Sequence, residues 1–312
     1  MADLKDIATR EAYGQFLVEY GKTRKDLVVM NADLSGSNKT DYFEKAYPER
    51  FVEIGISEQD MLAEAAGIAH SGHVVAASSF TMFASGRGFE IIRNSIAHTK
   101  ANVKVCATHG GVTVGEDGAT HQTFEDLAIM RTMPGLMVLN PADANSTFAL
   151  LKQVFDADGP AYVRLSRSGV PKVYEESDAA KLKFGKGNQI KDGNDIAIIA
   201  TGLMVSAALE AAKTLAESGI NARVIDIHTI KPLDEELVIK AAKETGKVVT
   251  AEEHSIIGGL GSAVAEVLSR NCPTKMAMVG QHDTFGESGK PAELLKKYGM
   301  TAEDIVNAVK SL

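Results

Sequence analysis

One acidic residue, Glu58, stands where an apolar segment gives way to a helical pattern. Residues 51–56 are apolar and β-branched, as at the end of a buried strand, and Ser57 is a residue type that often caps helices. Glu58 is therefore expected in the first turn of a helix at the rim of a sheet. A carboxylate there can take part in proton transfer. The alternative is an acid that only complements the helix dipole.

Two phenylalanines, Phe80 and Phe83, directly follow the apolar strand predicted over 74–77. Two phenyl rings three residues apart at a strand exit can stack on a flat heterocycle. Packing in the core is the alternative interpretation of both rings.

The loop over 107–122 combines His109, Asp117 and His121 with four glycines. Glycines let the backbone approach a ligand closely, while His and Asp supply proton transfer and oriented hydrogen bonds. This composition suits a binding site better than a core, although a structural role for the histidines stays open.

Two arginines, Arg164 and Arg167, lie where the strand predicted over 161–165 ends. A guanidinium at a strand terminus suits a phosphate or a carboxylate, and a surface ion pair is the alternative. The glycine-rich segment 258–262 resembles a phosphate loop but fits neither the dinucleotide fingerprint nor the Walker pattern. Close packing between a strand and a helix is the favoured interpretation there.

Apolar strands alternate with helical patterns in both halves of the chain, which predicts an α/β fold of two consecutive domains. Each domain is expected to be a mostly parallel sheet with helices on both faces. The predicted strands are 27–30, 51–56, 74–77, 103–107, 136–139, 161–165, 196–200, 222–227, 248–251 and 276–279, and the first-half helices are 5–20, 58–70, 86–98 and 142–155. The predicted division is a first domain at 1–175, a linker at 176–192 and a second domain at 193–312.

The composition excludes several classes of protein. The 312 residues carry 33 basic and 41 acidic side chains, a net charge of -8, without a basic cluster for nucleic acid. The two cysteines have no metal-ligand spacing, and they are expected to be reduced core residues of a cytoplasmic protein. No apolar run reaches the ~20 residues of a bilayer span, and no apolar leader is visible.

Taken together, the motifs resemble the C-terminal half of transketolase, in family order and over essentially the whole chain. The resemblance is carried by the segments 8–10, 31–38, 55–59, 80–83, 107–109, 115–122 and 165–167. It implies a thiamine diphosphate enzyme whose first domain binds the pyrimidine ring and whose second is the family's C-terminal domain.

The resemblance also implies a role for each candidate residue. Glu58 would hydrogen-bond the ring nitrogen N1′ of the cofactor, and Phe83, with Phe80 beside it, would pack on the pyrimidine ring. Asp117 and His121 would meet the sugar near its carbonyl and hydroxyls. The sugar phosphate would be held by Arg10, Ser37, His109 and Arg167.

Two departures from the family pattern matter. The position three after Phe83, often aromatic in transketolases, is Gly86, so the far side of the pocket is expected to be built differently, with Arg87 as a candidate. The family's Gly-Asp-Gly motif with a later Asn, which binds the diphosphate and a divalent metal (Mg or Ca), is missing. The chain is therefore expected to be one subunit of a split transketolase, assembled as α2β2 with a partner that carries the missing domain.

Alternatives to a transketolase subunit remain open. Segments 159–162, 230–234 and 252–261 also resemble deoxyxylulose-phosphate synthases and the β subunits of 2-oxo-acid dehydrogenases. Thr108 and His109 together with residues 116–121, Arg10 and Ser37 favour transketolase. A noncatalytic scaffold subunit is the alternative from another class, and intact Glu58, His121 and Arg167 argue against it.

Overall fold

The computed structural model describes residues 6–312, and its first sheet has seven strands in the order β10-β5-β6-β4-β3-β1-β2. All neighbours in this sheet are parallel except β10 and β5. The strands are β1 (Leu27–Asn31), β2 (Phe51–Glu53), β3 (Val74–Phe80), β4 (Val103–Thr108), β5 (Met137–Leu139), β6 (Ala161–Leu165) and β10 (Thr229–Lys231). Every residue of β3 and β4 is buried, as expected for parallel strands that helices cover on both faces.

Two layers of helices enclose this sheet because successive strand residues point to opposite faces. Val75 and Ala77 belong to one apolar cluster and Ala76 to another. Helices α1 (Thr9–Thr23) and α7 (Ala144–Asp156) pack on the Ala76 face, and α4 (Glu58–His70) and α6 (Asp126–Arg131) pack on the other face. Shorter elements connect them: α2 (Ser35–Asn38), α3 (Asp41–Ala46), η1 (Pro48–Arg50), η2 (Met82–Arg87), α5 (Phe89–Ile91), η3 (Ile92–Ala97), η4 (Val112–Asp117) and α8 (Glu176–Ala179).

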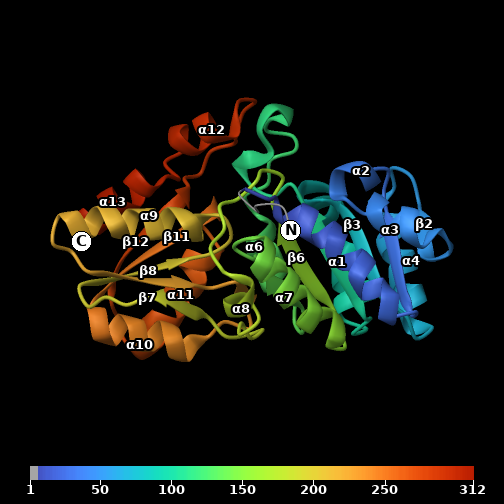
Figure 1. Ribbon diagram of the computed structural model, residues 1–312, viewed down its shortest axis with the longest axis horizontal. Helices are drawn as coiled ribbons and strands as arrows, with labels where there is room; N and C mark the ends of the chain where they lie inside the picture. The colour runs from blue at the N-terminus through green and yellow to red at the C-terminus, as the bar shows by residue number, and fades with distance from the viewer. Residues whose placement is uncertain (1–5) are drawn as a thin grey trace.

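The second sheet has five strands in the order β12-β11-β8-β9-β7, all parallel except β7. The strands are β7 (Asn188–Lys191), β8 (Ile196–Ala200), β9 (Ala222–Asp226), β11 (Lys247–Ser255) and β12 (Lys275–Gln281). Helices α9 (Met204–Glu217) and α13 (Ala302–Lys310) lie on one side, and α10 (Glu235–Thr245) and α11 (Leu260–Asn271) on the other (Figure 1). The expected α/β fold with two mostly parallel sheets is confirmed.

Several expected boundaries differ from the observed ones. The strand expected to reach Ile56 ends at Glu53, and the helix expected over 86–98 is a run of π and α turns that begins at Met82. The first helix begins at Thr9, and its expected first residue, Lys5, lies outside the described residues. The expected linker 176–192 contains α8 and β7, because residues 188–191 hydrogen-bond to the edge strand β9. The domain boundaries themselves stay a prediction.

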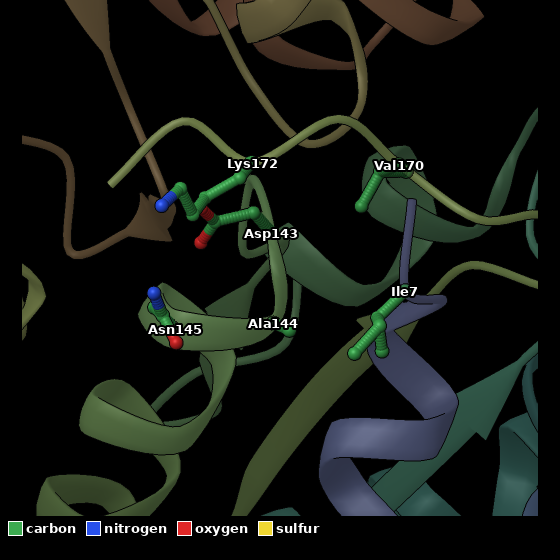
Figure 2. Close-up of a pocket in the computed structure, with 6 residues that line it drawn as sticks. All are labelled: Ile7, Asp143, Ala144, Asn145, Val170 and Lys172. Atoms are coloured by element: carbon green, nitrogen blue, oxygen red, sulfur yellow. The ribbon is translucent and has the colours of Figure 1, made fainter. Parts of the chain in front are cut away.

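The start of α7 shows how the segment that follows β6 is held against the first sheet. Asp143 caps the helix by accepting a hydrogen bond from the Ser146 amide at 2.8 Å, and its second oxygen accepts the amides of Val173 and Tyr174, also at 2.8 Å. Figure 2 shows Asp143 facing a small cavity of about 10 Å³ that Lys172 also lines. Such a space holds about one water molecule, so the cavity is not a sugar site.

Two observations bear on the expected cellular setting. Cys106 is buried, Cys272 is partly buried, and both are free thiols. Across residues 6–312, no helix has both the length and the apolar character that crossing a bilayer requires.

Candidate active site

The carboxyl ends of three neighbouring strands lie in register at one edge of the first sheet. Phe80 of β3 pairs with Thr108 of β4, which pairs with Leu165 of β6. The residues that follow these strand ends therefore lie close together, and this edge is where open α/β sheets bind ligands.

Glu58 is the first residue of α4 and its side chain is only 2% exposed. Ser79 Oγ donates a hydrogen bond to Glu58 Oε1 at 3.2 Å, and Arg87 Nη1 donates to Glu58 Oε2 at 3.3 Å. Ser57 occupies the expected N-cap position, but its hydroxyl makes no capping bond. The Glu58 carboxylate is thus fixed from the sheet side by Ser79, while its other oxygen meets an arginine that is 55% exposed.

The two phenylalanines, Phe80 and Phe83, differ in burial and in their neighbours. Phe80 is buried between the His109 ring, whose centroid is 3.8 Å away, and the Phe83 ring at 6.2 Å. Phe83 is partly exposed, and the Arg87 guanidinium carbon lies 5.0 Å from its ring centroid. Phe83 is therefore the more exposed of the two rings, with Arg87 over it, and Phe80 supports it. Arg87 reaches both Phe83 and Glu58.

A chain of hydrogen bonds fixes the proton position on His109. Arg10 Nη1 lies 3.1 Å from His109 Nε2, and because a guanidinium can only donate, Nε2 accepts. His109 Nδ1 then carries the proton and donates to Thr108 Oγ1 at 2.8 Å, and Thr108 Oγ1 donates to Asn38 Oδ1 at 2.5 Å. The imidazole is held neutral in one tautomer.

The surroundings of His109 are strongly electropositive. Burial, together with the positive charges of Arg10 and Arg167, lowers the pKa of His109 to about 3. Burial and Arg167 also lower the pKa of Arg10. The two guanidiniums disfavour a further positive charge on the neighbouring imidazole. For the same reason, they favour a bound anion at this place.

Ser37 and Arg167, which were expected to hold a sugar phosphate with their side chains, have protein partners in this structure. The backbone carbonyl of Ser37, not its hydroxyl, accepts a hydrogen bond from Arg10 Nη1 at 3.0 Å, which leaves the hydroxyl free for another partner. Arg167 Nη1 pairs with Glu116 Oε2 at 3.4 Å, and the Arg167 side chain is 33% exposed. A ligand phosphate would compete with Glu116 for this guanidinium.

The predicted loop residues lie on the side of the site nearest to α12 (Pro291–Lys297). The His121 ring meets the Phe83 ring edge-on at 5.3 Å, and His121 Nδ1 lies 2.9 Å from Thr120 Oγ1. Asp117 is exposed at the end of η4. His121 is therefore brought to the aromatic pair, whereas Asp117 stands at the open rim.

Some residues of the site escape the sequence patterns. Ser79 lies in the fully buried strand β3, where an unpaired hydroxyl is unfavourable. A serine in a strand predicted to be buried therefore indicates a polar partner nearby. Glu116 carries no signal beyond being an acid in the glycine-rich loop. Arg164, a candidate for ligand binding, is 3% exposed and its Nε lies 3.1 Å from Asp126 Oδ2, so its guanidinium is buried against a protein carboxylate.

The glycine-rich segment before α11 is not open to a phosphate. The amides of Leu260 and Gly261 donate to the two oxygens of the buried Glu252 carboxylate at 2.7 and 2.8 Å. A Cβ on Gly259 would lie 2.1 Å from Glu252 Oε2. Glu252 thus takes the position that an anion would need at the helix N-terminus, and the packing interpretation is confirmed.

Among residues 6–312, no group of three or more His, Cys, Asp or Glu side chains is arranged to hold a metal ion. The assignment of the metal to another chain stays a prediction. The fold is that of an open α/β protein, in which a carboxylate, a partly exposed aromatic ring and two guanidiniums lie at one sheet edge.

Comparison with known proteins shows to which family of open α/β proteins the chain belongs. Residues 5–172 match the family model "Transketolase, pyrimidine binding domain", and residues 185–305 match "Transketolase, C-terminal domain". A putative transketolase C-terminal section of Methanocaldococcus jannaschii is 50% identical over 96% of this chain and 94% of that protein. An apulose-4-phosphate transketolase subunit of Phocaeicola vulgatus is 41% identical over 96% of this chain and 95% of that protein.

A solved structure agrees with these sequence matches. A split gene transketolase, described as an inactive β4 tetramer, superposes with a TM-score of 0.91 at 52% identity and covers 98% of both chains. The chain belongs to the transketolase family of thiamine diphosphate enzymes and corresponds to the C-terminal section of a split transketolase.

Proposed function

We propose that this chain is a subunit of a transketolase that moves a two-carbon ketol unit between phosphorylated sugars. The observation that carries the proposal is the convergence of Glu58, Phe83, His109 and Arg167 on one edge of the first sheet. Arg10 joins them from α1. A carboxylate and a partly exposed aromatic ring on one side, and two guanidiniums on the other, suit a cofactor ring and a sugar phosphate.

The residues present fit the pyrimidine ring of thiamine diphosphate. The Glu58 carboxylate is buried, Ser79 occupies one of its oxygens, and the other meets only an exposed arginine within the described chain. The partly exposed Phe83 ring contacts the same Arg87 side chain as Glu58, and Phe80 lies next to Phe83. Glu58 would hydrogen-bond the ring nitrogen N1′ and carry a proton toward it, and Phe83 would stack on the ring. When bound, the cofactor supplies the nucleophilic carbon that accepts the two-carbon unit.

The remaining site residues would bind and orient the sugar. Arg10 and Arg167 would pair with the phosphate, and the Ser37 hydroxyl would complete the clamp. His109, being neutral with Nε2 as acceptor toward Arg10, would hold that guanidinium in place. His121 and Asp117 would meet the sugar hydroxyls and carbonyl, and His121 can pass a proton there.

The chain is proposed to act only with a partner that carries the diphosphate- and metal-binding domain, in an α2β2 assembly. Three observations support this. The matched family domains include no diphosphate domain, the Phocaeicola vulgatus relative is named as one subunit of its enzyme, and the similar split transketolase is described as an inactive β4 tetramer. Ile56, two residues before Glu58, is 76% exposed, so apolar surface borders the site.

Reconstitution tests the proposal. The chain is assayed for ketol transfer with thiamine diphosphate and Mg²⁺, alone and together with a chain that carries the Gly-Asp-Gly motif. We expect activity only in the mixture, at a mass that corresponds to two copies of each chain. Substantial activity of the chain alone would refute the split arrangement. Decarboxylation of pyruvate by the mixture, without ketol transfer, would instead support a deoxyxylulose-phosphate-synthase-like or 2-oxo-acid dehydrogenase function.

A further inference from the structure

The loop that carries Asp117 and His121 is closed by residues of the second domain. Its first and last parts meet where the Gly111 amide donates to the Thr123 carbonyl at 3.1 Å. Next to this closure lies Glu253, near the end of β11, with a side chain that is 3% exposed. Glu253 Oε1 accepts a hydrogen bond from the Thr113 amide at 2.7 Å.

The Arg164 side chain of β6 contacts both Glu253 and the end of the loop at Thr123. Its Nη2 donates to the Glu253 carbonyl at 2.8 Å and lies 3.4 Å from the Thr123 carbonyl, while its Nη1 lies 4.0 Å from Glu253 Oε2. Asp126 balances the remaining charge of the guanidinium at 3.1 Å. Both ends of the loop are thereby tied to a buried ion pair between the two domains.

The glycines of the loop allow this close approach. A Cβ on Gly110 would lie 2.4 Å from Arg164 Nε, and a Cβ on Gly111, whose φ is +83°, would lie 2.2 Å from Glu253 Cδ. Both distances are far below normal contact, so the backbone passes directly over Arg164 and Glu253 because it lacks side chains there.

The tip of the same loop rests on the segment that leads into α12. Gln122 Nε2 donates to the Glu287 carbonyl at 2.9 Å, and a Cβ on Gly118 would lie 2.4 Å from Ser288 Oγ. Figure 1 shows α12 beside the η4 segment, far in sequence but adjacent in space. The second domain thus contacts the loop at its closure and at its tip.

We propose that the second domain positions the substrate loop, and that Glu253 is the positioning residue that fixes the Thr113 amide. Glu253 does not reach the site itself and acts through the loop that presents Asp117 and His121. The inference rests on the proposed function, since it assigns to that loop the binding of the sugar.

Two substitutions of Glu253 distinguish the effect of its side-chain length from the effect of its charge. Glu253→Asp keeps the charge beside Arg164 but withdraws the carboxylate from the Thr113 amide by one methylene. Glu253→Gln removes the charge but keeps the length and an acceptor oxygen. Asp226→Asn is the matched control, because Asp226 is also a fully buried second-domain carboxylate but pairs with Tyr174, at 2.7 Å, away from the loop.

Kinetics of the reconstituted complex and amide exchange of the chain test the proposal together. For Glu253→Asp we expect faster exchange over 112–122 and a KM for the sugar phosphate raised about tenfold, the loss of one charged hydrogen bond, with kcat nearly unchanged. Glu253→Gln and Asp226→Asn should keep the wild-type KM and exchange.

The opposite pattern would overturn the proposal. If Glu253→Gln raises KM and Glu253→Asp does not, the side chain serves only to balance Arg164. If Glu253→Asp and Asp226→Asn behave alike in both measurements, the loop does not depend on Glu253. A wild-type complex without ketol transfer would refute the proposed function, and the exchange data would still decide whether Glu253 anchors the loop.

Discussion

Arg87 Nη1 lies 3.3 Å from Glu58 Oε2, and the same guanidinium lies over the Phe83 ring. Arg87 therefore makes the two kinds of contact that the proposed pyrimidine ring would make, a hydrogen bond to Glu58 and stacking on Phe83. A cofactor that binds as proposed must displace this side chain. Because Arg87 is 55% exposed, the contact is weak enough to exchange.

Replacing Arg87 by alanine should tighten thiamine diphosphate binding to the complex. The competing ion pair, of which Arg87 is the exposed partner, is worth about 0.5 to 1 kcal/mol, which corresponds to a Kd about two- to fivefold lower. Titration of the apo complex, followed by fluorescence or calorimetry, measures this. Arg93→Ala, an exposed arginine that contacts Asn94, is the control and should leave Kd unchanged. Weaker binding in Arg87→Ala would show that Arg87 holds the cofactor instead of competing with it.

Replacing Glu58 by alanine should abolish turnover with little loss of stability. Proton transfer by a positioned carboxylate typically contributes at least about 100-fold, and we expect a loss of that size or more in kcat. The free energy of unfolding should change by only about 1 kcal/mol, since Glu58 contacts a serine and an exposed arginine instead of the apolar core.

Asp60→Ala is the matched control for Glu58, because Asp60 lies in the same first turn of α4 but is exposed. It should retain full turnover. If the two variants are equally active, the role of Glu58 is limited to the helix dipole and the cofactor proposal for this residue is wrong.

Replacing Arg167 by alanine should weaken the binding of phosphorylated sugars. Loss of a charge-assisted pair costs about 2 to 3 kcal/mol, so KM should rise about 30- to 150-fold while a nonphosphorylated donor is hardly affected. Steady-state kinetics with both kinds of donor check this. Glu116→Gln offers the complement: it frees Arg167 from its 3.4 Å ion pair and should lower the KM. Equal effects on both donors would remove Arg167 from the phosphate site.

The buried His109 should make the protein less stable in acid. Its pKa of about 3 in the folded chain lies below the ordinary value of 6.5, so the unfolded chain binds the extra proton first. The stability that depends on the neutral ring is complete above pH 6.5 and is lost as pH falls toward 3, by up to about 1.4 kcal/mol per pH unit.

Chemical denaturation of wild type and His109→Asn between pH 4 and 8 tests this sign. As pH falls below 6.5, the free energy of unfolding of the wild type should decrease steadily relative to that of the variant. Above pH 6.5 the difference between the two should be constant. A difference that does not depend on pH would mean that the imidazole is solvated enough to accept a proton in the folded chain.

Local patterns in the sequence determined the strand–helix alternation, the fold class and the residue types of the site. Buried β-branched runs predict parallel strands whatever their neighbours are, and the order of motifs predicts that Glu58, Phe83, His109 and Arg167 share one edge. The element boundaries at the rim of the sheet were harder to predict, since tertiary surroundings override local propensity there. The π turns begin at Met82, and β2 already ends at Glu53.

Only the tertiary structure decided which partner each polar side chain meets. Arg164 and Arg167 lie three residues apart on the same strand exit, yet Arg164 is buried between Asp126 and Glu253 of the second domain, whereas Arg167 is partly exposed and pairs with Glu116. Glu253 reaches Thr113 across 140 positions of sequence. Such contacts depend on how two separately folded sheets pack, and no local periodicity encodes that packing.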